Sequence, residues 1–231
     1  MENTGNRGAS RHLPKPIPER IKEAREARGF TLDSFAVALG KSRQAVAQFE
    51  TGQSAPSGET LSQIVAVTRQ PLAFFVSAPA RSGSHGTVFW RSLKRMEQHH
   101  RKRVSRRLQW AADVARLVDE FVELPTVDIP QWDFDPDSAG EHEIEEAAEF
   151  LRTYWGLGSG PLSDLAATLE SKGVILVREN VECSDMDAVS CWIDGRPYIL
   201  LAGEVRSGPR DLFNLAHELG HLFLHASMDV T

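Results

Sequence analysis

The strongest constraint on the fold lies near the end of the chain, where His217, Glu218 and His221 form an H-E-x-x-H motif inside the apolar run 212–224. Residues four apart share one face of a helix, so a helix here places both imidazoles side by side. Two such imidazoles can bind one Zn²⁺ ion, and a neighbouring glutamate can act as general base toward the attacking water. The pattern predicts metal-assisted hydrolysis. The alternative that the motif alone leaves open is a core helix whose histidines pair with carboxylates.

The residues around the motif have the pattern of a small α+β unit. Apolar residues recur at helical spacing across 212–224, and Pro209 with Asp211 suits a helix start. Upstream, three short runs rich in β-branched and aliphatic residues are separated by turns, and Asp194-Gly195 lies between the last two. We therefore expect a strand at 174–177, a hairpin formed by 187–193 and 197–201, and then the helix that carries the motif.

Residues 216–225 read A-H-E-L-G-H-L-F-L-H, and with the strands before them they resemble the ImmA/IrrE family of bacterial and phage metallo-endopeptidases. The resemblance extends over about residues 140–231. It implies a zincin-like α+β fold, zinc as cofactor, and a protein or peptide as substrate. It also implies that His217 and His221 are metal ligands and that Glu218 is the catalytic residue.

A catalytic zinc site usually has three protein ligands and a water. In the family that this segment resembles, the third ligand is a carboxylate on a later helix, whereas the sequence continues for ten residues after His221. We therefore expect a C-terminally incomplete domain that binds zinc weakly and hydrolyses peptides poorly. His225 would lie about 12 Å along the helix axis from His217, and Asp229 is the other downstream candidate. Three explanations remain open: the sequence is shortened, the third ligand is supplied from elsewhere, or the domain has lost tight metal binding.

Residues 18–76 contain the start and stop residues that are typical of five short helices. Pro18 suits a first helical position, Thr31 and Ser42 suit N-caps, and Gly40 and Gly52 suit helix ends. Two short capped helices joined by a tight glycine-containing turn form the helix-turn-helix motif. We expect helices from Pro18 to Gly29 and at 32–39, 43–51, 58–67 and 71–76.

Two segments resemble the Cro/CI-type (XRE) repressor domain. Residues 30–36 read F-T-L-D-S-F-A, and residues 40–52 read G-K-S-R-Q-A-V-A-Q-F-E-T-G. The resemblance implies double-stranded operator DNA as a partner. An arginine can read guanine and a glutamine can read adenine in the major groove. The alternative is an ordinary helical bundle with a polar exposed face. At the matching positions, the resemblance implies that DNA is bound by Thr31, Ser42, Arg43, Gln44 and Gln48. It also implies a structural ion pair between Arg25 and Glu50.

Charge divides the chain into two halves. Residues 1–110 contain 19 Lys and Arg against 8 Asp and Glu, whereas residues 111–231 contain 7 against 24. The first half therefore suits phosphate and the second does not. We expect a disordered tail at 1–14, the helix-turn-helix domain at 15–76, a linker at 77–91, a long helix at 92–124 and the metallopeptidase domain at 125–231.

The long helix between the domains has a heptad-like apolar seam and a basic first half. Such a seam either packs on the second domain or forms a dimer, and the basic half is either a phosphate-contacting arm or a solvated helix end. The seam consists of Val104, Leu108, Ala111, Ala115, Val118 and Val122, widened by Val114, Leu117 and Phe121.

Other features point to an intracellular protein. The sequence has neither a signal peptide nor a membrane-spanning run, so we expect a cytoplasmic protein with no membrane partner. Its two cysteines, Cys183 and Cys191, are expected to be reduced core thiols, with a disulfide across the hairpin as the alternative.

The sequence as a whole predicts a multidomain protein with an all-α helix-turn-helix domain, a long connecting helix and an α+β zincin-like metallopeptidase domain. The predicted function is a homodimeric transcriptional regulator that controls gene expression by proteolysis of a repressor or of itself. One alternative is a regulator without catalysis, whose protease-like domain senses a signal or dimerises. Another is a zinc peptidase that uses its first domain to dock on a protein.

Overall fold

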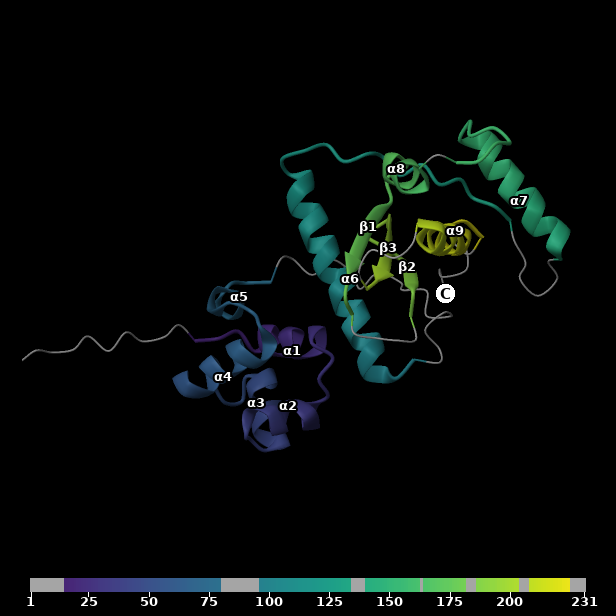
Figure 1. Cartoon of the computed structure of the whole chain (residues 1–231). Coiled ribbons are helices and arrows are strands. Elements are labelled where there is room, and N and C mark those ends of the chain that lie inside the picture. Colours follow the sequence, from purple (N-terminus) through teal and green to yellow (C-terminus); the bar gives the residue numbers. More distant parts are fainter. Residues whose placement is uncertain are drawn as a thin grey trace, which may run out of the picture. The chain divides into compact units, whose positions relative to one another are not determined.

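The computed structural model describes residues 15–79, 96–133, 140–162, 164–181, 186–203 and 208–224 (Figure 1). The chain divides into two compact units, Met1–Pro79 and Ala80–Thr231. The predicted multidomain organisation, with a helical first part and an α+β second part, is confirmed. None of the described helices is long and apolar enough to cross a membrane.

The first unit contains the five helices α1 (Pro18–Ala27), α2 (Leu32–Leu39), α3 (Arg43–Thr51), α4 (Gly58–Thr68) and α5 (Leu72–Val76). Their ends follow from local chemistry. The Thr31 hydroxyl accepts from the Ser34 amide at 3.1 Å, and the Ser42 hydroxyl accepts from the Ala45 amide at 3.2 Å. Gly40 and Gly52 end α2 and α3 with φ of 60° and 75°, a region that glycine adopts without the steric cost of a Cβ.

A single apolar core holds these helices together. Its fully buried members are contributed by α1, α2, α3, α4 and α5, so each of these short helices is stabilised by packing against the others. The buried core residues are Ile21, Ala24, Phe35, Ala36, Leu39, Val46, Phe49, Leu61, Ile64 and Phe75.

The second unit is built around a three-stranded sheet of β1 (Ile175–Glu179), β2 (Ala188–Ile193) and β3 (Arg196–Ala202), in the order β1-β3-β2. β2 and β3 form an antiparallel hairpin in which Ser190 lies opposite Ile199. Asp194 and Gly195 connect them with φ of 50° and 76°, as a tight hairpin turn requires. β1 pairs with β3 in parallel.

The two faces of the sheet belong to two different apolar cores, because side chains alternate along a strand. Val189, Cys191 and Ile193 of β2 face a core that includes α6 (Gln98–Asp119). Ala188 and Trp192 of the same strand pack against the core on the opposite face. That second core is formed with α7 (Glu141–Tyr154), α8 (Leu165–Ser171) and α9 (Gly208–Leu224). Figure 1 accordingly shows α6 and α9 on opposite sides of the strands.

The long helix is shorter than its sequence pattern predicts. The long helix expected at 92–124 ends at Asp119, and residues 92–95 lie outside the described residues. Asp119 itself ends the helix by accepting a hydrogen bond from the amide of Leu124 at 3.2 Å, just before a proline. α8 begins at Leu165 because the Asp164 carboxylate accepts from the Ala167 amide at 2.9 Å and so caps it there.

The apolar seam of α6 divides along its length. Val104 and Leu108 are fully buried against the sheet. Toward the end of the helix, Val114, Leu117 and Phe121 are 60%, 56% and 79% exposed. The first part of the seam therefore packs on the second unit, and the last part remains at the surface of the described structure. The basic half is not simply solvated, since Arg103 is buried and Arg107 forms an ion pair with Glu179 at 2.8 Å.

Candidate metal centre and nucleic-acid interface

The H-E-x-x-H motif lies on α9, and its two histidines and its glutamate occupy different parts of the helix surface. Leu215 and Leu222 are buried in the core beneath the helix, and Glu218, three and four residues away from them, is buried on the same stripe. His217 is exposed and His221 is half-buried, so the imidazoles lie on the flank of α9. The motif therefore presents two histidines toward solvent and directs its glutamate toward the sheet.

The two imidazoles are arranged as a pair of metal ligands would be. Their Nε2 atoms are 3.2 Å apart, and their rings are almost perpendicular, with an interplanar angle of 88°. Two nitrogens bound to one tetrahedral zinc at about 2.05 Å would be about 3.3 Å apart. The separation of the two Nε2 atoms is therefore close to that of two imidazoles bound to one zinc ion.

The environment also favours the form of His221 that binds metal. Burial lowers the pKa of His221 below its ordinary value, and the neighbouring His217 lowers it further, while the charge of Glu218 acts in the opposite direction. The neutral ring is the form that donates a lone pair to a metal.

Glu218 is held by Ser190, a residue whose role the sequence motif does not indicate. The Ser190 hydroxyl on β2 donates to Glu218 Oε2 at 2.6 Å, and the two residues are only 1% and 3% exposed. The signal in the sequence was a lone hydroxyl in the apolar strand 188–193, but its partner lies 28 residues away. The adjacent Cys191 is a free, buried thiol, as expected, and burial raises its pKa to about 12, with a smaller effect of the Glu218 charge. Cys183 lies outside the described residues.

A third ligand is not found among the described residues, which contain no group of three or more His, Cys, Asp or Glu side chains that could hold a metal ion. His225 and Asp229, the two candidates from the sequence, lie outside the described residues. The site as described therefore consists of two imidazoles and a nearby buried carboxylate.

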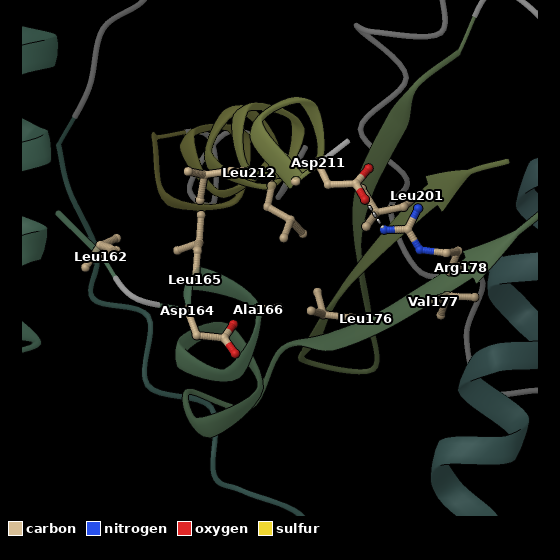
Figure 2. Close-up of a pocket in the computed structure, with 12 residues that line it drawn as sticks. Leu162, Asp164, Leu165, Ala166, Leu176, Val177, Arg178, Leu201, Asp211 and Leu212 are labelled. Atoms are coloured by element: carbon tan, nitrogen blue, oxygen red, sulfur yellow. Dashed lines mark hydrogen bonds and ion pairs between the residues drawn. The ribbon is translucent and has the colours of Figure 1, made fainter. Parts of the chain in front are cut away.

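A separate pocket of about 440 Å³ lies between α8, β1 and the first half of α9 (Figure 2). Leucine side chains form most of its wall, and Asp211 and Arg178 form an ion pair at 2.8 Å on one side of it. The α9 residues that line it, Asp211, Leu212 and Leu215, do not include either histidine. This pocket is distinct from the histidine pair.

In the first unit, the residues expected to read DNA lie along α3. Arg43 and Gln44 are exposed and Gln48 is half-buried. Arg43 Nη1 lies 3.5 Å from Oδ2 of Asp33, a residue of α2. Both side chains are 66% exposed, so this pair constrains Arg43 only weakly.

Other predicted site residues have structural positions. Thr31 and Ser42 cap α2 and α3, as described above, so their hydroxyls already serve the helix ends. Arg25 and Glu50 form a bidentate ion pair, with Nε–Oε1 and Nη2–Oε2 distances of 2.5 and 2.9 Å. Arg25 also donates to the Phe30 carbonyl at 2.9 Å, which ties α1 to the start of the helix-turn-helix.

The fold and the two sites define a class of protein in which a helix-turn-helix unit precedes an α+β unit with a histidine pair. Comparison with protein families matches residues 21–75 to the Helix-turn-helix family and residues 169–230 to the IrrE N-terminal-like domain, a peptidase family. The first segment is therefore similar to XRE-type helix-turn-helix domains and the second to ImmA/IrrE-like domains. Neither curated proteins nor solved structures gave a match.

Proposed function

We propose that this chain is a DNA-binding transcriptional regulator whose second unit is a zinc metallo-endopeptidase. Its peptidase activity would control gene expression by cleaving a repressor or a second copy of the chain itself. The observation that carries this proposal is the 3.2 Å separation of the His217 and His221 Nε2 atoms beside a buried Glu218 carboxylate. The match of the first unit to the Helix-turn-helix family supports DNA as the partner.

The chemistry follows from the residue types. Zinc held by the two imidazoles would polarise the scissile carbonyl and make a bound water acidic. Glu218 accepts a proton from the attacking water and passes it to the leaving amine nitrogen. In the described structure β2 pairs with β3 alone and presents its other edge, and an extended peptide can add to such an edge through backbone hydrogen bonds. Ser190 places that strand directly beside Glu218.

Zinc binding tests the site directly. Because the described residues supply two ligands, we expect the 231-residue chain to lose zinc to a competing chelator, and His217→Ala or His221→Ala to abolish measurable binding. His142→Ala is the matched control, since His142 is exposed on α7. Stoichiometric, tightly held zinc would contradict the expectation of weak binding, and Asp229→Asn and His225→Ala would then be the first variants to test.

DNA binding is tested at the start of α3. Arg43→Ala is expected to cost about 1–3 kcal/mol at the preferred site and to relax base choice there, because an exposed arginine at this position can read guanine. Lys22→Ala removes a similar positive charge from the exposed surface of α1 and serves as control. Gel shifts with a library of sites measure both effects. An equal loss on every sequence would mean that Arg43 contacts only phosphate.

We also propose that the chain is a homodimer formed through the exposed end of α6. One recognition helix reads one half-site, so a full operator needs two. The exposed residue Val114 lines an apolar groove of about 520 Å³ between α6 and β1, and Leu117, three residues further along α6, is also exposed. In a pair of α6 helices, these exposed apolar side chains would contact those of the second copy.

Leu117→Glu is expected to convert this dimer into a monomer, because it places a charge in the apolar contact. Sedimentation velocity measures the change. Ile144→Glu, on the exposed face of α7, should leave the dimer intact. A Leu117→Glu chain that still sediments as a dimer would assign the contact to another surface.

The second candidate function is a regulator that senses a small molecule instead of cleaving a protein. The leucine-lined pocket in Figure 2 favours it, since pockets of this size that are lined mainly by apolar side chains with a few polar groups bind small ligands. Under this alternative, a small-molecule screen by thermal unfolding finds a ligand whose stabilising effect Leu212→Trp removes. Peptide hydrolysis that depends on Glu218 would favour the peptidase instead.

A further inference from the structure

We propose that Ser190 is the positioning residue for Glu218: its hydroxyl fixes one carboxylate oxygen on β2 so that the other is left to accept the proton of the attacking water. This inference rests on the proposed peptidase function. It assigns to the strand a role in the reaction that the H-E-x-x-H motif by itself does not contain.

The hydrogen bond is short and fully enclosed. The Ser190 hydroxyl lies 2.6 Å from Glu218 Oε2, and 1% of Ser190 and 3% of Glu218 are exposed. Charge-assisted O–H···O⁻ bonds have this length and are about twice as strong as neutral ones. Within the described residues no second side chain donates to Glu218 and no ion pair includes it. A carboxylate in such a place has a large cost unless it is hydrogen-bonded, so the hydroxyl determines where it points.

The donor is itself rigidly placed. Ser190 lies in the middle of β2, opposite Ile199 of β3, which is fully buried. Val189 and Cys191 on either side of it are fully buried under α6. The strand therefore cannot shift along β3 without exposing two apolar side chains or moving the serine to the other face.

The arrangement uses the two carboxylate oxygens for different tasks. Oε2 accepts from the serine, and Oε1 has no partner among the described residues. Glu218 lies in the same turn of α9 as His217 and His221, and the oxygen that the serine does not bind is the one available to accept a proton. Without the serine, both oxygens can rotate about the last side-chain bond, and the proton acceptor spends less time in the productive orientation.

The test is a comparison of kcat and KM for a fluorogenic peptide in excess zinc. Ser190→Ala should lower kcat about 10- to 100-fold, as loss of a supporting hydrogen bond typically does, with little change in KM or in zinc affinity. Ser190→Thr keeps a hydroxyl and should recover most of kcat. In a Glu218→Gln chain, Ser190→Ala should lower the remaining rate no further, because the serine acts through Glu218.

Val189→Ala is the matched control, since it removes buried atoms from the neighbouring position of β2 on the opposite face and should lower stability without lowering kcat. Thermal unfolding of the metal-free variants gives a second readout, in which Ser190→Ala should destabilise the wild-type chain more than the Glu218→Ala chain. If the wild type hydrolyses the peptide and Ser190→Ala has the same kcat, the positioning role is overturned but the proposed function is not. A wild-type rate equal to that of Glu218→Gln overturns the proposed function, and the positioning role with it.

Discussion

Glu218→Gln is expected to lower the rate of peptide hydrolysis by about 10²- to 10⁴-fold, the range that a general base contributes, while zinc binding is unchanged. The substitution keeps the shape of the side chain. Its amide oxygen can still accept from Ser190, so the buried contact with β2 survives. What is lost is the ability to accept a proton, and the two imidazoles, which bind the metal, are untouched.

Hydrolysis of a peptide library by mass spectrometry, in excess zinc, measures this loss for each cleaved bond. Glu146→Gln on α7 is the matched control, because its side chain is 58% exposed and distant in sequence from the motif. Zinc content measured on the same samples separates loss of the base from loss of metal. Equal cleavage by wild type and Glu218→Gln would remove the general-base role and support the small-molecule regulator.

Arg25→Ala is expected to destabilise the first unit by about 3–5 kcal/mol, the usual cost of leaving one partner of a buried ion pair alone. Both side chains of the Arg25–Glu50 pair are only 7% exposed, so Glu50 would retain its charge with little water. The substitution also removes the donor to the Phe30 carbonyl. A cost of this size approaches the whole stability of a small domain.

Chemical denaturation followed by circular dichroism, with the full chain, measures the change. Asp33→Ala is the control, because it breaks an ion pair whose members are 66% exposed, and such pairs contribute about 0–1 kcal/mol. Replacing both buried partners, as Arg25→Met with Glu50→Leu, should cost less than Arg25→Ala alone. A loss no larger than that of Asp33→Ala would show that water reaches Glu50 when the arginine is removed.

Local signals predicted the first unit well. Thr31, Ser42, Gly40 and Gly52 determine helix ends through contacts within a few residues, so they can be recognised without knowledge of the fold. The helix that carries the H-E-x-x-H motif was predicted for the same reason. The apolar pattern after residue 119 also continues a helix, but an Asp119 side chain that binds the Leu124 amide ends it.

The parts that the sequence did not show depend on contacts between distant residues. Nothing near Ser190 indicates that it meets a glutamate 28 positions later, because that contact depends on how α9 lies on the sheet. The division of the α6 seam is of the same kind, since one apolar stripe meets the sheet only over its first half. Periodicity identifies which face is apolar but not what covers it.

The buried position of Cys191 keeps a thiol, a strong metal ligand, out of the candidate metal centre. Burial raises the pKa of the Cys191 thiol to about 12, so the thiol is protonated at pH 7, whereas the thiolate is the form that binds metals and reacts readily with oxidants. Cys191 also faces the α6 side of the sheet, whereas Glu218 lies on the other side. Although the cysteine is next to Ser190 in the sequence, its side chain is fully buried on the opposite face of the sheet and is not placed to bind an ion held by the imidazoles.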